Sequence, residues 1–380
     1  MENMWQFDNN YFLNTIKKID GIIATKKLTK EQIGLLEEDK LYLFSCLGEK
    51  PEEKQIDLDE ALKRIEKKLI NQINKMGMEN IYYTYNIVQF IVRQSNGHET
   101  IFEEEVNNRR EIFDKTLLFY ENLDPLFYNI ASQLVNSKHK LYHFSENPMV
   151  IDECVFMNYN RLPMVTIHDT KNMKLYVKLA HEMQHQIDNV INNHKYPNYS
   201  GFNHLLTECS AIFSELLCCD QISNENPSLV DCNSLFLYRI NNIDSLSFDL
   251  MRYLNLIIKF ENNNSKLDIN TFYEFYESNF YMTTEEHMTS YLNHLLEYDI
   301  FNSMKYLYSY LIALDLRTIY KSNQKEALSL LKYIINFELN DYGFDSIKKK
   351  GVGIDKYQNG PYNHLKHIME VDNKRLALIK

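Results

Sequence analysis

Apolar residues recur with a helical period along the first third of the chain. From residue 57 to 75 they follow one another at intervals of three or four, at Leu58, Leu62, Ile65, Leu69 and Ile73. Asp57 with Glu60 forms a capped start for this helix, and Gly77 ends it. The same spacing continues from Ile81 to Val92, and then in segments 102–120 and 125–138. The pattern therefore predicts helices from the start of the chain to about residue 140.

The pattern changes near residue 141. Two short segments, 149–157 and 162–168, are rich in β-branched residues and are bounded by Asn and Pro, which predicts two strands. Asp169 and Thr170 can then cap a helix from about 171 to 192. Beyond this helix the spacing of apolar residues is helical again, as far as the end of the chain.

Glycine and proline are scarce, with 10 and 7 among 380 residues, so turns are few and the elements are long. We therefore expect a mostly α fold with a small β element. The simplest division is an N-terminal helical lobe at residues 1–140, followed by a second lobe at 141–380 that carries the candidate chemistry.

Charge and composition narrow the classes of partner. The formal net charge of −11 gives no basic footprint for nucleic acid or anionic lipid. No stretch approaches the roughly 18 to 20 apolar residues that span a bilayer, and the polar start MENMWQFDNN lacks the features of a signal peptide. The six cysteines have no CxxC or disulfide-framework spacing, which favours reduced thiols. We expect a cytoplasmic protein without nucleic-acid or membrane partners; its oligomeric state stays open.

Residues 181–185 read His-Glu-Met-Gln-His. Two histidines four apart on a helix project from one face, so both can reach one zinc ion. Glu182 can hold a water, take its proton as general base and deliver it to a leaving amine. The apolar stripe of the same helix lies on roughly the opposite side, at Tyr176, Leu179, Met183, Ile187 and Val190. This placement favours metal ligands over histidines packed in the core.

A catalytic zinc site needs a third protein ligand. Glu208 is the better candidate, and Glu215, seven residues on, shares its helical stripe. Glu215 and Asp188 would not bind the metal themselves but would orient its ligands. Two alternatives stay open: the glutamates can be a surface acidic pair, and His204 is a rival third ligand.

These residues carry a resemblance. Residues 160–192 and 205–217 resemble the thimet oligopeptidase and oligoendopeptidase F family of HExxH zinc peptidases. The segment LPMVTIHDTKNMKLYVKLAHEMQHQID is similar to the family's strand, loop and active-site helix. Glu208 with Glu215 resembles its two glutamates seven residues apart, of which the first binds zinc. Further on, KYLYSYLIAL at 305–314 is similar to the family's tyrosine-rich segment, and 330–355 resembles its closing helix and turn.

The resemblance implies a fold, a cofactor and an activity. It implies a two-lobed helical shell around a channel, with one Zn²⁺ per chain, cleaving short peptides rather than folded proteins. By family position, Tyr306 and Tyr310 are the candidate donors to the transition state, with Tyr308 behind them. The family has a histidine about six or seven residues before the tyrosine segment, where this chain has Asp299 and Ile300. The nearest histidine here is His294, so either the loop is longer in this chain or that transition-state donor is absent.

The chain also departs from the family. Gln184 stands where the family usually has Gly, and Asp188 stands where it has His. The first lobe is much shorter than the family's, which leaves room for a more open channel. We therefore predict a zinc-dependent endopeptidase acting on short peptides, and keep three alternatives: a processing protease for one precursor, a non-catalytic peptide-binding protein on the same shell, and a helical scaffold with a chance motif. The intact Glu182 disfavours a non-catalytic protein.

Overall fold

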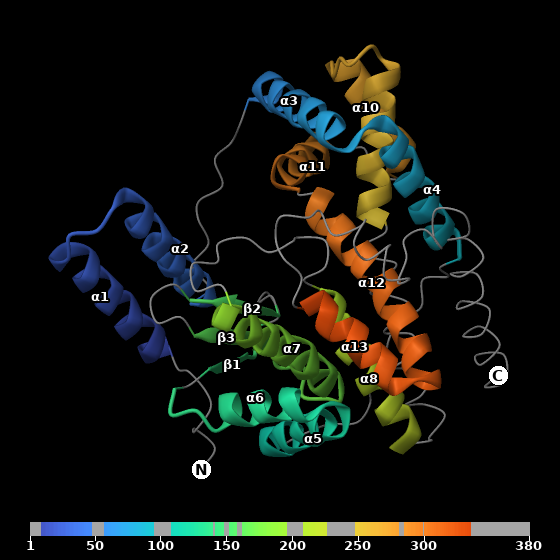
Figure 1. The fold of residues 1–380 in the computed structure, drawn as a ribbon. Helices are drawn as coiled ribbons and strands as arrows, with labels where there is room; N and C mark the ends of the chain where they lie inside the picture. The colour runs from blue at the N-terminus through green and yellow to red at the C-terminus, as the bar shows by residue number, and fades with distance from the viewer. Residues whose placement is uncertain are drawn as a thin grey trace. The chain divides into compact units, whose positions relative to one another are not determined.

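The computed structural model describes residues 9–47, 57–94, 108–139, 141–147, 152–157, 162–195, 208–225, 248–280, 285–298 and 300–335. These residues are mostly helical with one three-stranded sheet, which confirms the predicted fold class (Figure 1). None of the helices in these ranges is long and apolar enough to cross a membrane.

The helices and strands have the following bounds. The first six helices are α1 (Asn9–Thr25), α2 (Lys30–Cys46), α3 (Leu58–Met76), α4 (Met78–Gln94), α5 (Arg109–Leu123) and α6 (Pro125–Val135). The strands are β1 (Tyr142–Ser145), β2 (Glu153–Phe156) and β3 (Pro163–His168). The later helices are α7 (Lys174–Lys195), α8 (Cys209–Glu225), α10 (Ile269–Asn279), α11 (Glu285–Glu297), α12 (Ile300–Ser322) and α13 (Gln324–Ile335), and residues 248–262 are also helical.

Contacts within the chain gather into two compact units, each built from three segments. The first unit comprises Met1–Glu52, Ile101–Leu235 and Ile312–Val352. The second comprises Glu53–Thr100, Phe236–Leu311 and Gly353–Lys380. The sheet, α7 and α8 therefore belong to the first unit, and α3, α10 and α11 belong to the second. The division into lobes near residue 140 stays a prediction.

The sheet has the strand order β1-β3-β2. β3 pairs with β1 in parallel, with Tyr142 opposite Val165, and with β2 in antiparallel, with Glu153 opposite Thr166. The two predicted strands are thus confirmed as β2 and β3. The sequence did not predict β1, because a four-residue strand that contains His143 gives too short a pattern. Its formation depends on pairing with β3, which lies some twenty residues further along the chain.

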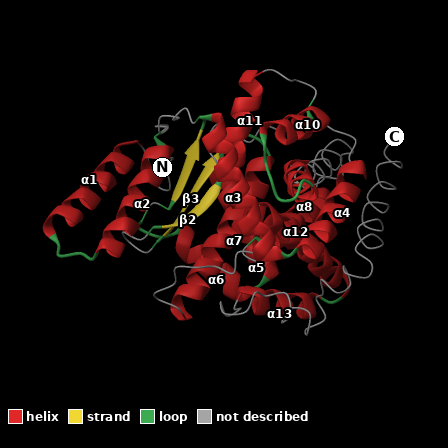
Figure 2. Cartoon of the chain, turned by 90° about the horizontal axis from the view of Figure 1, so that it is seen from above, coloured by secondary structure: helices red, strands yellow, loops and turns green. Residues whose placement is uncertain are grey.

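Helices cover the sheet on both faces (Figure 2). Neighbouring residues of β2 point to opposite faces: Val155 packs with Phe12, Leu43 and other side chains of the α1–α2 hairpin, and Cys154 faces α7, where its Sγ lies 3.8 Å from the Asn189 amide. Tyr42 of α2 shares a hydrogen bond of 2.7 Å with Thr166. The sheet is therefore a buried platform that holds α7.

The start of α7 differs from the prediction. Asp169 does not cap the helix, because its carboxylate accepts hydrogen bonds from the Arg109 guanidinium at 3.1 and 2.6 Å and from the backbone N–H of Lys171 at 3.1 Å. Lys171 takes a positive φ of 52°, and the helix begins only at Lys174. The Asn172 side chain then accepts from the Lys174 N–H at 3.1 Å, as a capping residue does.

The ends of α3, in the second unit, match the prediction. The Asp57 carboxylate accepts from the Glu60 N–H at 3.3 Å, and Gly77 follows the helix with φ of 75°, in the region that favours glycine. The residues buried along α3 are Ala61, Leu62, Ile65, Leu69 and Gln72.

Candidate active site

Helix α7 is buried on most of its surface. The predicted apolar stripe is buried at Tyr176, Leu179, Met183 and Ile187, and Val190 is half-buried. The sheet, α5, α6, α8 and α13 all pack against this helix, so polar residues away from the stripe are buried as well. From residue 181 to 189, only His181 and His185 are half-buried rather than buried. The side of α7 that carries the two histidines is therefore its least covered part between residues 181 and 189, although even these side chains are not fully exposed.

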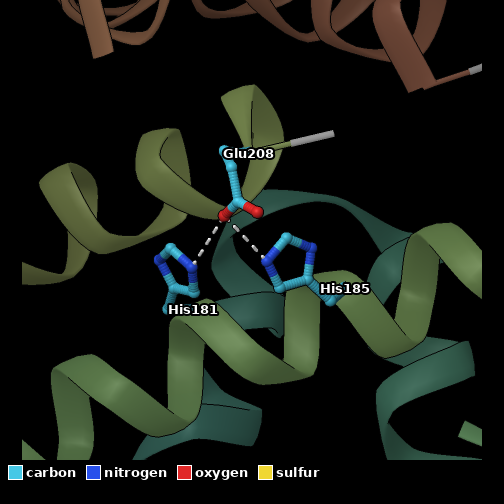
Figure 3. A group of neighbouring side chains, drawn as sticks. All are labelled: His181, His185 and Glu208. Atoms are coloured by element: carbon cyan, nitrogen blue, oxygen red, sulfur yellow. Dashed lines mark hydrogen bonds and ion pairs between the residues drawn. The ribbon is translucent and has the colours of Figure 1, made fainter. Parts of the chain in front are cut away.

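His181, His185 and Glu208 come together as the sequence predicted. The two histidines lie one turn apart on α7, and Glu208 directly precedes α8. In Figure 3 the three side chains point toward one another. Oε2 of Glu208 lies 3.3 Å from Nε2 of His181 and 3.1 Å from Nε2 of His185. One ligand atom from each residue lies within 4.8 Å of the other two.

This cluster fits a zinc ion. Ligands at the corners of a tetrahedral zinc site, with bonds of about 2.0–2.1 Å, stand about 3.3 Å apart. The two spacings between nitrogen and oxygen here, 3.3 and 3.1 Å, are close to that value. Two imidazoles with one carboxylate suit zinc, whereas calcium and magnesium prefer oxygen ligands alone. Three protein ligands also leave a fourth position for water or substrate.

Glu215 supports the cluster from α8. Its Oε2 accepts a hydrogen bond of 3.1 Å from Nδ1 of His181. A histidine that donates from Nδ1 keeps the lone pair of Nε2 for a metal. Burial by itself lowers the pKa of His181, but the hydrogen bonds to Glu208 and Glu215 raise it well above its ordinary value. The pKa of His185 is raised by Glu208 in the same way, against the effect of burial.

Glu182 is buried, with 4% of its surface exposed. Its Oε2 has no hydrogen-bond partner among the residues that the structure describes. Burial raises the pKa of this carboxyl, although the neighbouring His181 and His185 act to lower it. A buried carboxylate oxygen that lacks a partner is costly to stability, which is typical of a group kept for binding or catalysis.

Next to this cluster, four polar side chains join α7 to α8 through hydrogen bonds. Gln184 donates from Nε2 to Oδ1 of Asp188 at 2.8 Å. Ser214 donates to Oε1 of Gln184 at 3.0 Å, and Ser210 donates to Oδ2 of Asp188. All four side chains are buried. Burial raises the pKa of Asp188 to about 6, and the hydrogen bonds from Ser210 and Gln184 limit that rise. We call these four residues the α7–α8 network.

The supporting role of Asp188 stays a prediction, and the sequence did not predict the hydrogen-bond partners of this residue. A signal was present, because Gln184 and Asp188 are four residues apart on one helix, and so are Ser210 and Ser214 on the next. Which serine meets which α7 residue depends on how the two helices pack, which the spacing alone does not determine.

The remaining predicted residues lie in the second unit, except His204, which is outside the described ranges. Tyr310 is buried and Tyr306 half-buried on α12, and the Tyr308 hydroxyl shares a hydrogen bond of 3.0 Å with Thr84. His294 is exposed on α11, with its ring 5.9 Å from that of Tyr291. The catalytic roles of Tyr306, Tyr310 and His294 stay predictions.

Sequence comparison finds no matching protein family and no matching curated protein. Solved structures do match the fold. One is a protein of Chlamydophila abortus assigned as a peptidase, with a TM-score of 0.56 and 15% identity, over 98% of this chain and 61% of that one. Another is PZ peptidase A with an inhibitor, with a TM-score of 0.51 and 14% identity, over 96% of this chain and 67% of that one.

The chain thus has the fold of these two peptidases and spans 61% of the length of the first. The resemblance drawn from the sequence to a family of helical peptidases is supported at the level of the fold.

Proposed function

We propose that this chain is a zinc-dependent endopeptidase of the oligopeptidase type, which hydrolyses peptide bonds in short, unstructured peptides. The observation that carries the proposal is the cluster of His181, His185 and Glu208, next in sequence to a buried Glu182 whose Oε2 has no partner in the described chain. The fold shared with two peptidases supports it.

One Zn²⁺ per chain would be held by His181, His185 and Glu208. When bound, it supplies a Lewis acid that polarises a peptide carbonyl and lowers the pKa of a water. Glu215 holds the ring of His181 through Nδ1, so that Nε2 is directed toward Glu208. This contact fixes both the tautomer and the ring orientation.

Glu182 is the proposed general base. Its carboxylate takes the proton of the attacking water, and the resulting carboxylic acid gives that proton to the leaving amine. A pKa raised by burial suits both steps, because a base with a pKa nearer to neutral accepts a proton and returns it more readily. We propose Tyr306, Tyr310 and His294 as donors of hydrogen bonds to the oxyanion, in the manner of an oxyanion hole.

A digestion experiment tests the function. A library of mixed peptides of about 5 to 20 residues is incubated with the purified chain, and cleavage is read by mass spectrometry. We expect cleavage that a chelator abolishes and added zinc restores. We also expect no cleavage by His185→Ala, and loss of zinc from both His185→Ala and Glu208→Ala in metal analysis. Cleavage that survives complete removal of metal would contradict the proposal. Full zinc content in Glu208→Ala would show that another residue is the third ligand, and His204 would be the next candidate.

The preference for unstructured peptides has its own comparison. One target sequence is offered as a free peptide and as a rigid loop in a folded host. We expect the free peptide to be cut much faster, because a folded host must first lose local structure, at a cost of several kcal/mol out of the typical 5 to 15. Equal rates would instead favour a protease that processes folded precursors.

A further inference from the structure

The α7–α8 network lies behind the metal cluster without contributing a ligand to it. Two of its hydrogen bonds cross between the helices, from Ser210 to Asp188 and from Ser214 to Gln184, and one runs along α7 from Gln184 to Asp188. The two serines are one turn apart on α8, so they lie on the same side of that helix. The network therefore fixes two successive turns of α8 against α7.

Glu208 depends on this arrangement through the backbone. Its carbonyl accepts the hydrogen bond of Ile212 N–H at 2.8 Å, so Glu208 is the residue from which the first turn of α8 begins. Ser210 follows two residues later. If α8 rotated about its axis by one residue, about 100°, Ser210 would move away from Asp188. The same rotation would move Glu208 away from the two histidines. The hydrogen bonds and the direction of Glu208 thus belong to one register of the two helices.

Polar contacts specify that register better than apolar ones. Apolar side chains of similar size pack in several neighbouring registers with small differences in energy. A buried amide, carboxylate and hydroxyl pay a desolvation penalty in any register that leaves them without partners. Asp188 and Gln184 have these partners only in the observed register, because Ser210 and Ser214 occupy fixed positions on α8.

We infer that Gln184, Asp188, Ser210 and Ser214 form a positioning network that holds the first turn of α8 so that Glu208 is directed at His181 and His185. The inference rests on the proposed function, because it assigns these residues to the geometry of its metal site. None of the four belongs to the cluster of His181, His185 and Glu208, so they act as positioning residues through Glu208.

The test compares Asp188→Ala, which breaks the network, with Asp188→Asn, which can keep it. An asparagine at this position still accepts from Gln184, and its amide can donate to the Ser210 hydroxyl. Zinc affinity is measured by competition with a chromogenic chelator, and the visible absorption spectrum of the Co²⁺-loaded protein reports the ligand geometry. We expect Asp188→Ala to lower zinc affinity by about 10- to 100-fold and to alter the Co²⁺ spectrum. Asp188→Asn should stay within about threefold of wild type with an unchanged spectrum.

Ile222→Ala is the matched control. Ile222 is buried on the same helix, twelve residues beyond Ser210, so its removal lowers the melting temperature without touching the network. We expect its zinc affinity and Co²⁺ spectrum to be those of wild type. If Asp188→Ala does not fold, Ser210→Ala takes its place, with a smaller expected loss of about three- to tenfold in affinity.

The outcomes separate the inference from the proposed function. If the wild type binds zinc and cuts peptides, but Asp188→Ala and Ser210→Ala keep wild-type affinity and spectrum, the positioning role is wrong and the function stands. A loss of affinity in Ile222→Ala equal to that in Asp188→Ala would also overturn the inference, because general loosening would then explain both. If the wild type binds zinc with the expected Asp188 effects but cuts no peptide, only the proposed activity fails.

Discussion

Helices α3 and α7 are of similar length, 19 and 22 residues, but they bury different kinds of side chain. α3 buries one mainly apolar stripe centred on Ile65 and exposes most of the rest. α7 buries apolar and polar residues together, including Glu182, Gln184 and Asp188. The difference shows that a hydrophobic stripe explains how a helix packs, but not why a helix carries buried polar groups.

The two helices also differ in what their burial contributes. Each large apolar side chain buried along α3 contributes about 1.5–3 kcal/mol to folding. On α7, each buried polar group must recover its lost hydration through a hydrogen bond, and the Glu182 Oε2 has no partner in the described chain to do so. α3 therefore stabilises its unit, whereas α7 retains groups that oppose stability and serve the proposed site.

The largest expected effect is on activity, from Glu182→Gln. The amide keeps the size of the side chain but cannot accept the proton of a water, so peptide hydrolysis should fall by about 10²- to 10⁴-fold or more. Zinc content should be retained, and the free energy of unfolding should not fall, because a buried charge is removed without leaving a cavity. Rates on a fluorogenic peptide, metal analysis and urea unfolding measure the three quantities.

Glu60→Gln on α3 is the control. Glu60 is exposed and pairs with Arg64 on its own helix, so the rate of hydrolysis should be unchanged and the free energy of unfolding should change by no more than about 0.5 kcal/mol. Activity of Glu182→Gln within about tenfold of wild type would remove Glu182 from its role as base.

The next effect is on stability, from Ile65→Ala. Ile65 is fully buried on α3, and its truncation should lower the free energy of unfolding by about 2–5 kcal/mol through lost apolar burial and the cavity left behind. Zinc content and hydrolysis per folded molecule should stay at wild-type levels. Urea unfolding combined with active-site titration separates the two quantities. If Ile65→Ala had normal stability but reduced turnover, α3 would serve the activity rather than the stability of the chain, contrary to the expected difference between the two helices.

The smallest effect is the pH dependence of stability at Glu153, on the strand next to α7. Burial, with a contribution from the charge of Glu182, raises the pKa of Glu153 from 4.5 to about 7. Because the folded-state pKa lies above the unfolded one, the stabilising contribution is full below pH 4.5 and is lost as the pH rises through about 7. The partial exposure of the side chain reduces the expected loss to about 1 kcal/mol.

Glu153→Gln should therefore remove this loss. Zinc-free wild type and variant are unfolded in urea at pH 5 and pH 8, and the variant should lose about 1 kcal/mol less between the two. Glu60→Gln should follow the wild type at both values. Identical pH dependence in Glu153→Gln and wild type would show that Glu153 ionises in the folded chain as it does in the unfolded one.

The sequence predicted the features that depend on neighbouring residues, and it missed those that depend on contacts between distant segments. The ends of α3 follow from Asp57 and Gly77, and the placing of His181 and His185 side by side follows from their spacing on one helix, because these signals lie within a few residues of each other. The start of α7 was misplaced because Arg109, far away in sequence, binds the carboxylate of Asp169. Strand β1 and the serine partners of α7 were missed because they exist only once separate elements pack together.

The α7–α8 network also constrains how this chain can diverge. Gln184 and Asp188 are partners of each other, and each also depends on a serine of α8. A substitution of only one of them would leave a buried polar group without a hydrogen-bond partner. Such an intermediate would be less stable, so selection would act against it. Accepted changes should therefore come in pairs across the two helices. Among relatives of this chain, the residue at 184 should be informative about the residue at 188, while the exposed positions of α3 vary independently.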